Sequence, residues 1–303
     1  MLIIENKTEF HLQGKSAVAL GKFDGIHLGH RKLLDRVLEQ RKQGLSAVVF
    51  TFDTSAVSFF GGEEKVLSTK EEKRAIFARM GIDVLIEFPL NRETAATEPS
   101  DFVSRYLVDQ MQTAYLCAGP DISFGKGGAG DYALLARCAG DYGYQVELID
   151  KVRVDGEEVS STRVREAVRA GKMETANEML GAPYSVSGRV VHGRRLGRTL
   201  GMPTANLIPT EENLMPPNGV YYARVVVDGE SYRAISNVGY KPTVSKEEIL
   251  GIETYLYDFD GEIYDREIMV ELLAFRRREQ TFDNVDALRR QIVEDVAAGR
   301  TWR

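Results

Sequence analysis

The stretch Gly21-Lys22-Phe23-Asp24-Gly25-Ile26-His27-Leu28-Gly29-His30 separates two segments of different periodicity. Before it, residues 16–20 form a short, continuous apolar run that is typical of a buried β-strand. After it, long side chains recur at i, i+3, i+4 and i+7 from Leu34, which predicts an amphipathic helix over about residues 29–43, closed by Gly44. We therefore interpret the stretch as a glycine-rich turn that leads from a strand into a helix.

A turn of this kind suits an anion such as phosphate. Glycine lets the backbone approach a ligand where a Cβ atom would clash, and the first turn of a helix presents unpaired N–H groups with a partial positive charge. His27 and His30 are three residues apart, so both rings can face the same spot. Their N–H groups could donate to phosphate oxygens on which charge builds up during transfer.

Other interpretations of the same residues stay open. Glycine-rich turns before helices are common, and Asp24 and Gly25 are also ordinary turn residues. His27 and His30 could be zinc ligands, although no third Cys, His or Asp with metal-binding spacing lies nearby in the sequence.

The stretch resembles the signature of the nucleotidylyltransferase superfamily that has an H-x-G-H motif. The Phe-Asp-Gly at residues 23–25 is similar to that of the bacterial FAD synthetases, which are bifunctional riboflavin kinase/FMN adenylyltransferases. The resemblance implies that His27 and His30 are catalytic. It also implies that the turn binds ATP or its phosphates through Gly21, Phe23, Asp24 and Gly25.

The composition limits the class of protein. The chain has 303 residues, enough for two domains, and 43% of them are hydrophobic and 28% charged, as in globular proteins. The net charge of −6 argues mildly against a general nucleic-acid binder. The sequence predicts no signal peptide and no membrane span, and its two cysteines, Cys117 and Cys138, are interpreted as reduced, packed thiols. We therefore expect a cytoplasmic protein.

Two domains are predicted, residues 1–183 and residues 184–303. In the first, strand-like and helical segments alternate, which favours an α/β, Rossmann-like fold with a parallel sheet covered on both faces. Ser68 and Thr69 stand at capping-box spacing before two glutamates and predict a helix start, and Ser100 is the predicted cap of the next helix. Ligands of such sheets bind at the carboxyl ends of the strands, where the turn over residues 21–30 would lie.

A second glycine-rich segment, residues 119–131, follows a predicted strand. Its five glycines exclude a helix interior or a strand, and a mobile loop without a ligand is the plain interpretation. By the resemblance, Asp121, Phe124 and Gly125 match a loop that borders the nucleotide and the flavin in FAD synthetases. The chain departs from that family at Ile122-Ser123, where an aromatic residue and often a basic one are common.

The segment Val159–Arg165 opens a predicted amphipathic helix. Hydroxyl groups at a helix start act as caps and can also bind phosphate, and an arginine one turn later can reach the same anion. Capping alone would account for Ser160 and Ser161. The Ser-Ser-Thr-x-x-Arg pattern is similar to the second nucleotide-binding motif of the superfamily, which implies that Ser161, Thr162 and Arg165 hold ATP phosphates.

The second domain is predicted to be a small all-β barrel with a terminal helix. Short strands follow one another without intervening helices. Asp228-Gly229 marks one hairpin, and we expect a second hairpin around Asp260-Gly261, between strands at residues 253–259 and 268–274. Apolar residues at helical spacing predict the terminal helix over about residues 284–298.

This domain contains phosphate-binding signals of its own. Residues 193–201 combine a glycine at every fourth position with three arginines, which can neutralise a polyphosphate, and a basic surface loop is the plain alternative. Thr204 and Asn206 are two residues apart, so on an extended segment their oxygens face one side. Oxygen ligands of this kind suit Mg²⁺.

The segment Pro203-Thr204-Ala205-Asn206 looks like the riboflavin kinase signature. By that resemblance Thr204 and Asn206 hold Mg²⁺ and Glu253 is the catalytic base, whereas without it Glu253 would be a solvated strand residue. The resemblance also assigns ATP binding to four residues of the preceding loop, Gly193, Arg195, Gly197 and Gly201.

The resemblance covers nearly the whole chain and predicts two sequential reactions. Riboflavin is phosphorylated by ATP to FMN, and FMN is then adenylylated by a second ATP to FAD and pyrophosphate. The expected cofactor is Mg²⁺ and the expected partners are riboflavin, FMN and ATP, with no nucleic acid, no membrane and no indicated oligomeric state. The alternatives are a nucleotidylyltransferase for another alcohol phosphate, and a flavin-binding sensor without catalysis.

Overall fold

The protein is described from a computed structural model that covers residues 1–192, 202–242 and 248–302. Its contacts divide the chain into two compact units, residues 1–64 with 68–160, and residues 65–67 with 161 onward. Each unit is described by itself below. The domain boundary near residue 183 remains a prediction.

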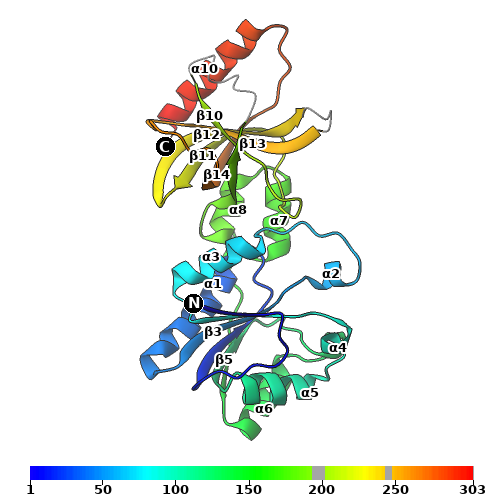
Figure 1. The fold of residues 1–303 in the computed structure, drawn as a ribbon. Coiled ribbons are helices and arrows are strands. Elements are labelled where there is room, and N and C mark those ends of the chain that lie inside the picture. Colours follow the sequence, from blue (N-terminus) through cyan, green and yellow to red (C-terminus); the bar gives the residue numbers. More distant parts are fainter. Residues whose placement is uncertain (193–201, 243–247, 303) are drawn as a thin grey trace. The chain divides into compact units, whose positions relative to one another are not determined.

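A parallel sheet forms the centre of the first unit, as the sequence predicts (Figure 1). The strand order is β1-β4-β3-β2-β5-β6, and all neighbouring strands run parallel. The edge strand β1 is an addition to the strands that the sequence indicates. The strands are β1 (Leu2–Glu5), β2 (Ser16–Leu20), β3 (Ser46–Phe52), β4 (Val84–Phe88), β5 (Thr113–Ala118) and β6 (Gln145–Leu148).

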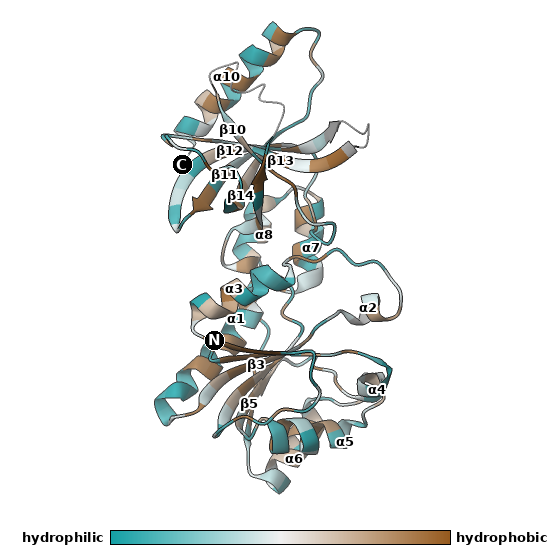
Figure 2. Cartoon of the chain, viewed as in Figure 1, coloured by the Kyte–Doolittle hydropathy of each residue, from teal (hydrophilic) through white to brown (hydrophobic). Residues whose placement is uncertain are grey.

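Helices cover both faces of this sheet, and each face has its own apolar core. Leu34 of α1 and Phe77 of α3 pack on one face, whereas Leu107 of the π-helix η2 and Leu135 of α6 pack on the other. Figure 2 shows hydrophobic residues concentrated in the central strands. The remaining elements are α1 (Leu28–Glu39), η1 (Gln40–Gln43), α2 (Ala56–Phe59), α3 (Lys70–Met80), α4 (Arg92–Ala95), α5 (Pro99–Asp101), η2 (Phe102–Gln110), η3 (Lys126–Gly128), α6 (Tyr132–Tyr142), β7 (Arg153–Val154) and β8 (Glu157–Glu158).

The two predicted helix starts in this unit have different outcomes. Thr69 caps α3. Its hydroxyl oxygen accepts from the backbone N–H of Glu72 at 3.3 Å, and the Glu72 carboxylate accepts from the backbone N–H of Thr69 at 2.8 Å. The prediction that Ser100 is a cap is wrong, because α5 already begins at Pro99 and Glu98 holds the cap position. Proline is favoured at the first helical position, since its fixed φ matches the helix and its missing N–H has no partner there in any case.

The second unit contains a closed antiparallel barrel with strand order β10-β13-β12-β11-β14-β9. The hairpin at Asp228-Gly229 is confirmed, and both residues adopt positive φ values of 51° and 83°, as a tight hairpin turn requires. The strands are β9 (Tyr184–Val191), β10 (Thr204–Leu207), β11 (Gly219–Val227), β12 (Glu230–Pro242), β13 (Glu248–Leu256) and β14 (Glu267–Arg278).

The predicted second hairpin around Asp260-Gly261 is wrong. The strand β13 pairs with β12 and β10, whereas β14 pairs with β11 and β9, so the two strands are not neighbours in the barrel. The turn dipeptide lies within a longer connection, residues 257–266, that carries the chain from one side of the barrel to the other. A turn dipeptide alone cannot show whether the flanking strands pair as a hairpin or are joined by a longer connection, because strand order is decided by closure of the whole barrel.

Two short helices, α7 (Ser161–Arg169) and α8 (Met173–Leu180), pack against each other, and α8 packs against β14 and β9. Asn177 of α8 makes the connection. Its Nδ2 donates to the carbonyls of Leu272 at 2.9 Å and Leu273 at 3.1 Å, and its Oδ1 accepts from the backbone N–H of Tyr184 at 2.6 Å. The helix pair is therefore fixed to β14 and to the start of β9.

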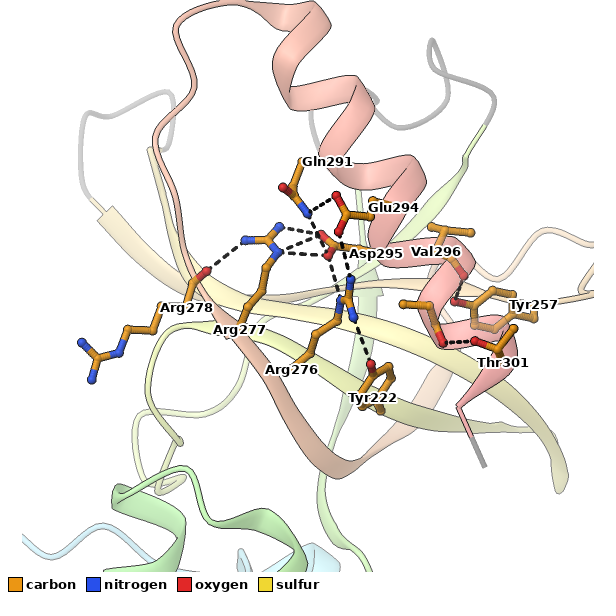
Figure 3. A network of polar contacts seen from close by, with 11 residues as sticks. Tyr222, Tyr257, Arg276, Arg277, Arg278, Gln291, Glu294, Asp295, Val296 and Thr301 are labelled. Carbon is orange, nitrogen blue, oxygen red and sulfur yellow. Dashed lines mark hydrogen bonds and ion pairs between the residues drawn. The ribbon is translucent and has the colours of Figure 1, made fainter.

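The terminal helix α10 (Val285–Thr301) docks on the barrel through a buried carboxylate (Figure 3). Arg276 and Arg277 of β14 both donate to Asp295, at 2.9 and 3.0 Å, and Arg276 also donates to the hydroxyl of Tyr222 at 3.0 Å. Burial alone would raise the pKa of Asp295, but the hydrogen bonds from the two arginines hold it below its usual value. Among the described residues, no helix is long and apolar enough to cross a membrane.

Candidate active sites

The turn over residues 21–27 is anchored from below by two apolar side chains. Phe23 and Ile26 are fully buried in the core of the first unit, and both have positive φ values, 52° and 43°. Gly25 between them has φ 78°. Such strained backbone persists where packing holds it, so the core fixes the loop and leaves its polar residues at the carboxyl end of β2.

His27 and His30 form a stacked pair at the start of α1. Their ring centroids are 3.7 Å apart and the ring planes differ by 13°. His27 is the N-cap residue, and its Nδ1 accepts from the backbone N–H of His30 at 3.3 Å. A Cβ atom on Gly29 would lie 3.2 Å from the His27 ring, so glycine gives this ring its space. Because Nδ1 is an acceptor, a neutral His27 has its proton on Nε2.

Both imidazoles are neutral at ordinary pH. Burial lowers the pKa of His27 to about 4, although the Asp121 carboxylate acts in the opposite direction. Burial, assisted by repulsion from Lys73 and from any proton on His27, also holds the pKa of His30 well below its usual value. The Nδ1 atom of His30 is enclosed and has no hydrogen-bond partner within the described part of the chain. An enclosed polar atom of this kind is expected to have a partner, and a bound ligand could supply one.

The loop after β5 lies beside this pair, because β5 is the neighbour of β2 in the sheet. The carboxylate of Asp121 in this loop is close enough to raise the pKa of His27. Its Oδ2 atom also lies 3.7 Å from the Nζ atom of Lys151. Phe124 is buried against Phe102 with ring centroids 5.1 Å apart, so its ring anchors the loop. Gly125 has φ 70°, and a Cβ atom there would lie 2.9 Å from Pro99.

The second predicted nucleotide-binding motif starts α7. Ser161 and Thr162 are its first two residues, and Arg165 lies one turn further along. By its contacts α7 belongs to the second unit, so the shared role of this motif with His27 remains a prediction.

The barrel brings together three of its predicted site residues. Thr204 and Asn206 of β10 project from one face of their strand, and Asn206 is the register partner of Glu253 on β13. The hydroxyl of Thr204 donates to Glu253 Oε1 at 2.6 Å. These side chains are half-buried, whereas Ala205 and Leu207 between and after them are buried inside the barrel.

The remaining predicted kinase residues are Gly193, Arg195, Gly197 and Gly201, which lie outside the described residues. Two further residues near Glu253, Asn237 and Glu279, have no predicted role. Asn237 is the register partner of Glu253, and its side-chain amide donates to Glu279. Asn237 belongs to a segment that resembles the family, Ser236-Asn237-Val238-Gly239. Glu279 belongs to a second such segment, residues 275–282, for which the resemblance names the three preceding arginines and gives Glu279 no role.

Comparison with known proteins assigns both units. A FAD synthetase family model matches residues 9–163, and a riboflavin kinase model matches residues 180–303. A bifunctional riboflavin kinase/FMN adenylyltransferase from Listeria monocytogenes is 36% identical over 94% of this chain and 91% of its own. The protein of the same name from Escherichia coli is 35% identical over 94% of this chain and 92% of its own. The chain belongs to this family.

A solved structure supports the same architecture. A crystal structure described as a macrolide-efflux protein from Streptococcus pneumoniae superposes with a TM-score of 0.88 at 31% identity, over 100% of this chain and 99% of that one. The predicted family, its fold class and its pair of enzyme activities are thereby confirmed. Bifunctional FAD synthesis consists of riboflavin phosphorylation followed by FMN adenylylation.

Proposed function

We propose that FMN adenylylation takes place at the His27–His30 corner. The phosphate of FMN attacks the α-phosphate of ATP, and this nucleophile is already an anion, so no side-chain base is required. The N-terminus of α1 and the Nε2–H of His27 donate to oxygens on which negative charge builds up. Ser161, Thr162 and Arg165 are proposed to bind ATP phosphates, and Asp121 with its loop is proposed to border the substrates.

The observation that supports this proposal most strongly is the state of the histidine pair. Two neutral rings stack at a helix N-terminus, and one of them has an enclosed nitrogen without a partner among the described residues. Neutral rings fit a role as hydrogen-bond donors with fixed positions, which lower a barrier without moving during the reaction.

We further propose that riboflavin is phosphorylated at the outer face of the barrel. Glu253 accepts the proton of the riboflavin 5′-hydroxyl, and this oxygen attacks the γ-phosphate of ATP, which breaks the bond to the β-phosphate and releases FMN and ADP. The hydrogen bond from Thr204 orients the Glu253 carboxylate. Gly193, Arg195, Gly197 and Gly201 are proposed to bind the ATP phosphates from the preceding loop.

The donor set of the barrel site fits Mg²⁺. Thr204 and Asn206 supply neutral oxygen atoms on one face of β10, and the Thr204 hydroxyl, whose proton points to Glu253, keeps its lone pairs for a cation. When bound, Mg²⁺ supplies charge neutralisation of the phosphates.

The two cysteines are free and buried, which supports the proposed cytoplasmic location.

One assay tests the proposal and its alternatives together. The protein is incubated with riboflavin, ATP and Mg²⁺, and the products are separated by chromatography. FMN followed by FAD is the expected result. FAD formed only from supplied FMN would indicate a transferase with an inactive barrel. The absence of both products, with riboflavin still bound, would indicate a flavin-binding sensor.

A further inference from the structure

A carboxylate held by two amides lies beside Glu253 on the outer face of the barrel. Asn237 of β12 is the register partner of Glu253, so the two side chains project from the same face of neighbouring strands. The Nδ2 atoms of Asn237 and Asn218 donate to the two oxygens of Glu279, at 3.4 and 3.2 Å. Three segments that are far apart in the sequence therefore meet at this one carboxylate.

The barrel leaves room for this carboxylate by placing glycine beneath it. A Cβ atom on Gly239 would lie 1.9 Å from Glu279 Oε1, so the carboxylate occupies the space of an absent side chain. The register partner of Gly239 is Gly251, which is two residues from Glu253 on the same face. Positions 239 and 253 are diagonal neighbours, about 7–8 Å apart. Two carboxylates thus flank a strip of the sheet without side chains.

The same carboxylate faces an open hollow of about 340 Å³, whose lining includes Asn218, Phe275, Arg278 and Glu279. A carboxylate has about four lone-pair sites, and the two amides use only part of this capacity. No cation among the described residues lies within ion-pair distance of Glu279. The remaining acceptor sites suit a ligand that brings hydroxyl groups.

We propose that Glu279, held by Asn218 and Asn237, binds inner hydroxyl groups of the alcohol whose terminal hydroxyl gives its proton to Glu253. This inference rests on the proposed function, in which that alcohol is riboflavin. The ribityl chain has hydroxyls on successive carbons, and a few such carbons span the about 7–8 Å between positions 239 and 253, beside which the two carboxylates lie. A hydroxyl that donates to a carboxylate makes a charge-assisted hydrogen bond, which is stronger than a neutral one.

The test compares riboflavin with a flavin that has a 5-hydroxypentyl chain, which keeps the terminal hydroxyl and lacks the inner ones. For the wild-type chain, kcat/KM is expected to favour riboflavin by about 100-fold, the effect of one or two hydrogen bonds to a charged group. In Glu279→Ala this preference is expected to fall below about 10-fold, mainly through a higher KM for riboflavin. The analogue makes no use of the carboxylate, so its rate changes little.

Two further variants sharpen the result. Asn218→Ala removes one of the amides that hold the carboxylate and is expected to weaken the preference less than Glu279→Ala does. Glu230→Gln is the matched control, because Glu230 is an exposed carboxylate at the opposite end of β12 and contacts Tyr232. It is expected to keep the wild-type preference.

Three outcomes would overturn the inference. Equal use of both flavins by the wild type, or an unchanged preference in Glu279→Ala, would exclude hydroxyl binding by Glu279; a purely structural role would slow both flavins equally. Loss of a preference for ATP over 2′,3′-dideoxy-ATP, with the flavin preference kept, would assign Glu279 to the nucleotide ribose. Failure of the proposed function looks different, because the wild type would then phosphorylate neither flavin, and both proposals would fall together.

Discussion

The two candidate sites are built in different ways. In the first unit, His27 and His30 stack at a helix start, and the donors that could face a ligand are backbone N–H groups and neutral rings. In the barrel, Thr204 and Glu253 project from the outer face of paired strands, where sheet register sets their spacing. The residues of the first site are positioned by a turn that is anchored in the core, and those of the second by the register of paired strands.

This difference matches the two nucleophiles. A phosphate needs no deprotonation, so a site of fixed neutral donors is sufficient for adenylylation. A hydroxyl has a high pKa and needs a base within hydrogen-bond reach, which a half-buried carboxylate can provide. The comparison therefore predicts that each site can be inactivated without the other.

The largest expected effect is that of Glu253→Gln on riboflavin phosphorylation. Glutamine keeps the shape of the side chain but cannot accept the proton, so the rate is expected to fall by about 10³-fold. Conversion of supplied FMN to FAD is expected to continue at the wild-type rate. Both rates are measured by chromatography of the same preparation, and riboflavin phosphorylation near the wild-type rate would place the base elsewhere.

His30→Ala is expected to have the converse effect. Removal of one fixed donor from a site that stabilises developing charge lowers the rate by about 10²–10³-fold, here in the conversion of FMN to FAD. Riboflavin phosphorylation serves as the internal control and is expected to be unchanged. Undiminished FAD production from FMN and ATP would refute the role of the histidine pair.

The sequence predicted the parts of the fold in which local pattern and tertiary structure agree. The strand at Ser16–Leu20, the capping box at Thr69 and the hairpin at Asp228-Gly229 each have a local physical cause, and each is present. The hairpin at Asp260-Gly261 failed because strand order in a closed barrel depends on long-range pairing. The prediction of Ser100 as a helix cap was wrong because the helix begins at Pro99, which needs no side-chain cap.

The site residues divide in a similar way. Thr204, Asn206 and Glu253 were predicted and lie together, because motif spacing on a strand translates directly into a common face. The ring of Phe124, in contrast, packs in the core, so its place in the predicted flavin loop is that of an anchor. Glu279 lies in a stretch, residues 275–282, that is similar to the family, but no role was predicted for it, because its position depends on two asparagines in distant segments.

A third prediction concerns how the barrel unit is held together. Asp295→Asn leaves the guanidinium groups of Arg276 and Arg277 without their carboxylate, which is expected to destabilise the barrel by about 3 kcal/mol. Trp302 is the only tryptophan of the chain and stacks on Tyr222, so its fluorescence reports on the docking of α10 during urea unfolding. FMN adenylylation in the first unit is measured in parallel.

The control for this variant is Glu294→Gln. Glu294 lies 3.8 Å from Arg276 but is exposed, so its loss is expected to change the unfolding free energy by less than about 0.5 kcal/mol. Equal stability of Asp295→Asn and the wild type would show that the buried ion pair is not what holds α10 on the barrel.

The smallest expected effect distinguishes the two units by their response to acid. His27 has a pKa of about 4 in the folded first unit and about 6.5 when unfolded, so between these values the unfolded state binds more protons. Stability of this unit therefore decreases as the pH falls through that window, by about 2 kcal/mol at pH 5 from this residue alone. His27→Asn removes the titrating ring but keeps a good N-cap residue, so the variant is expected to lose less stability between pH 7 and pH 5.

Hydrogen exchange of peptides from β2 and β5 measures the effect within the first unit, and peptides from β11 and β12 provide the comparison. An identical pH dependence in His27→Asn and the wild type would show that the ring takes up its proton at the same pH in the folded and unfolded chains, so burial would not hold His27 neutral below about pH 6.5.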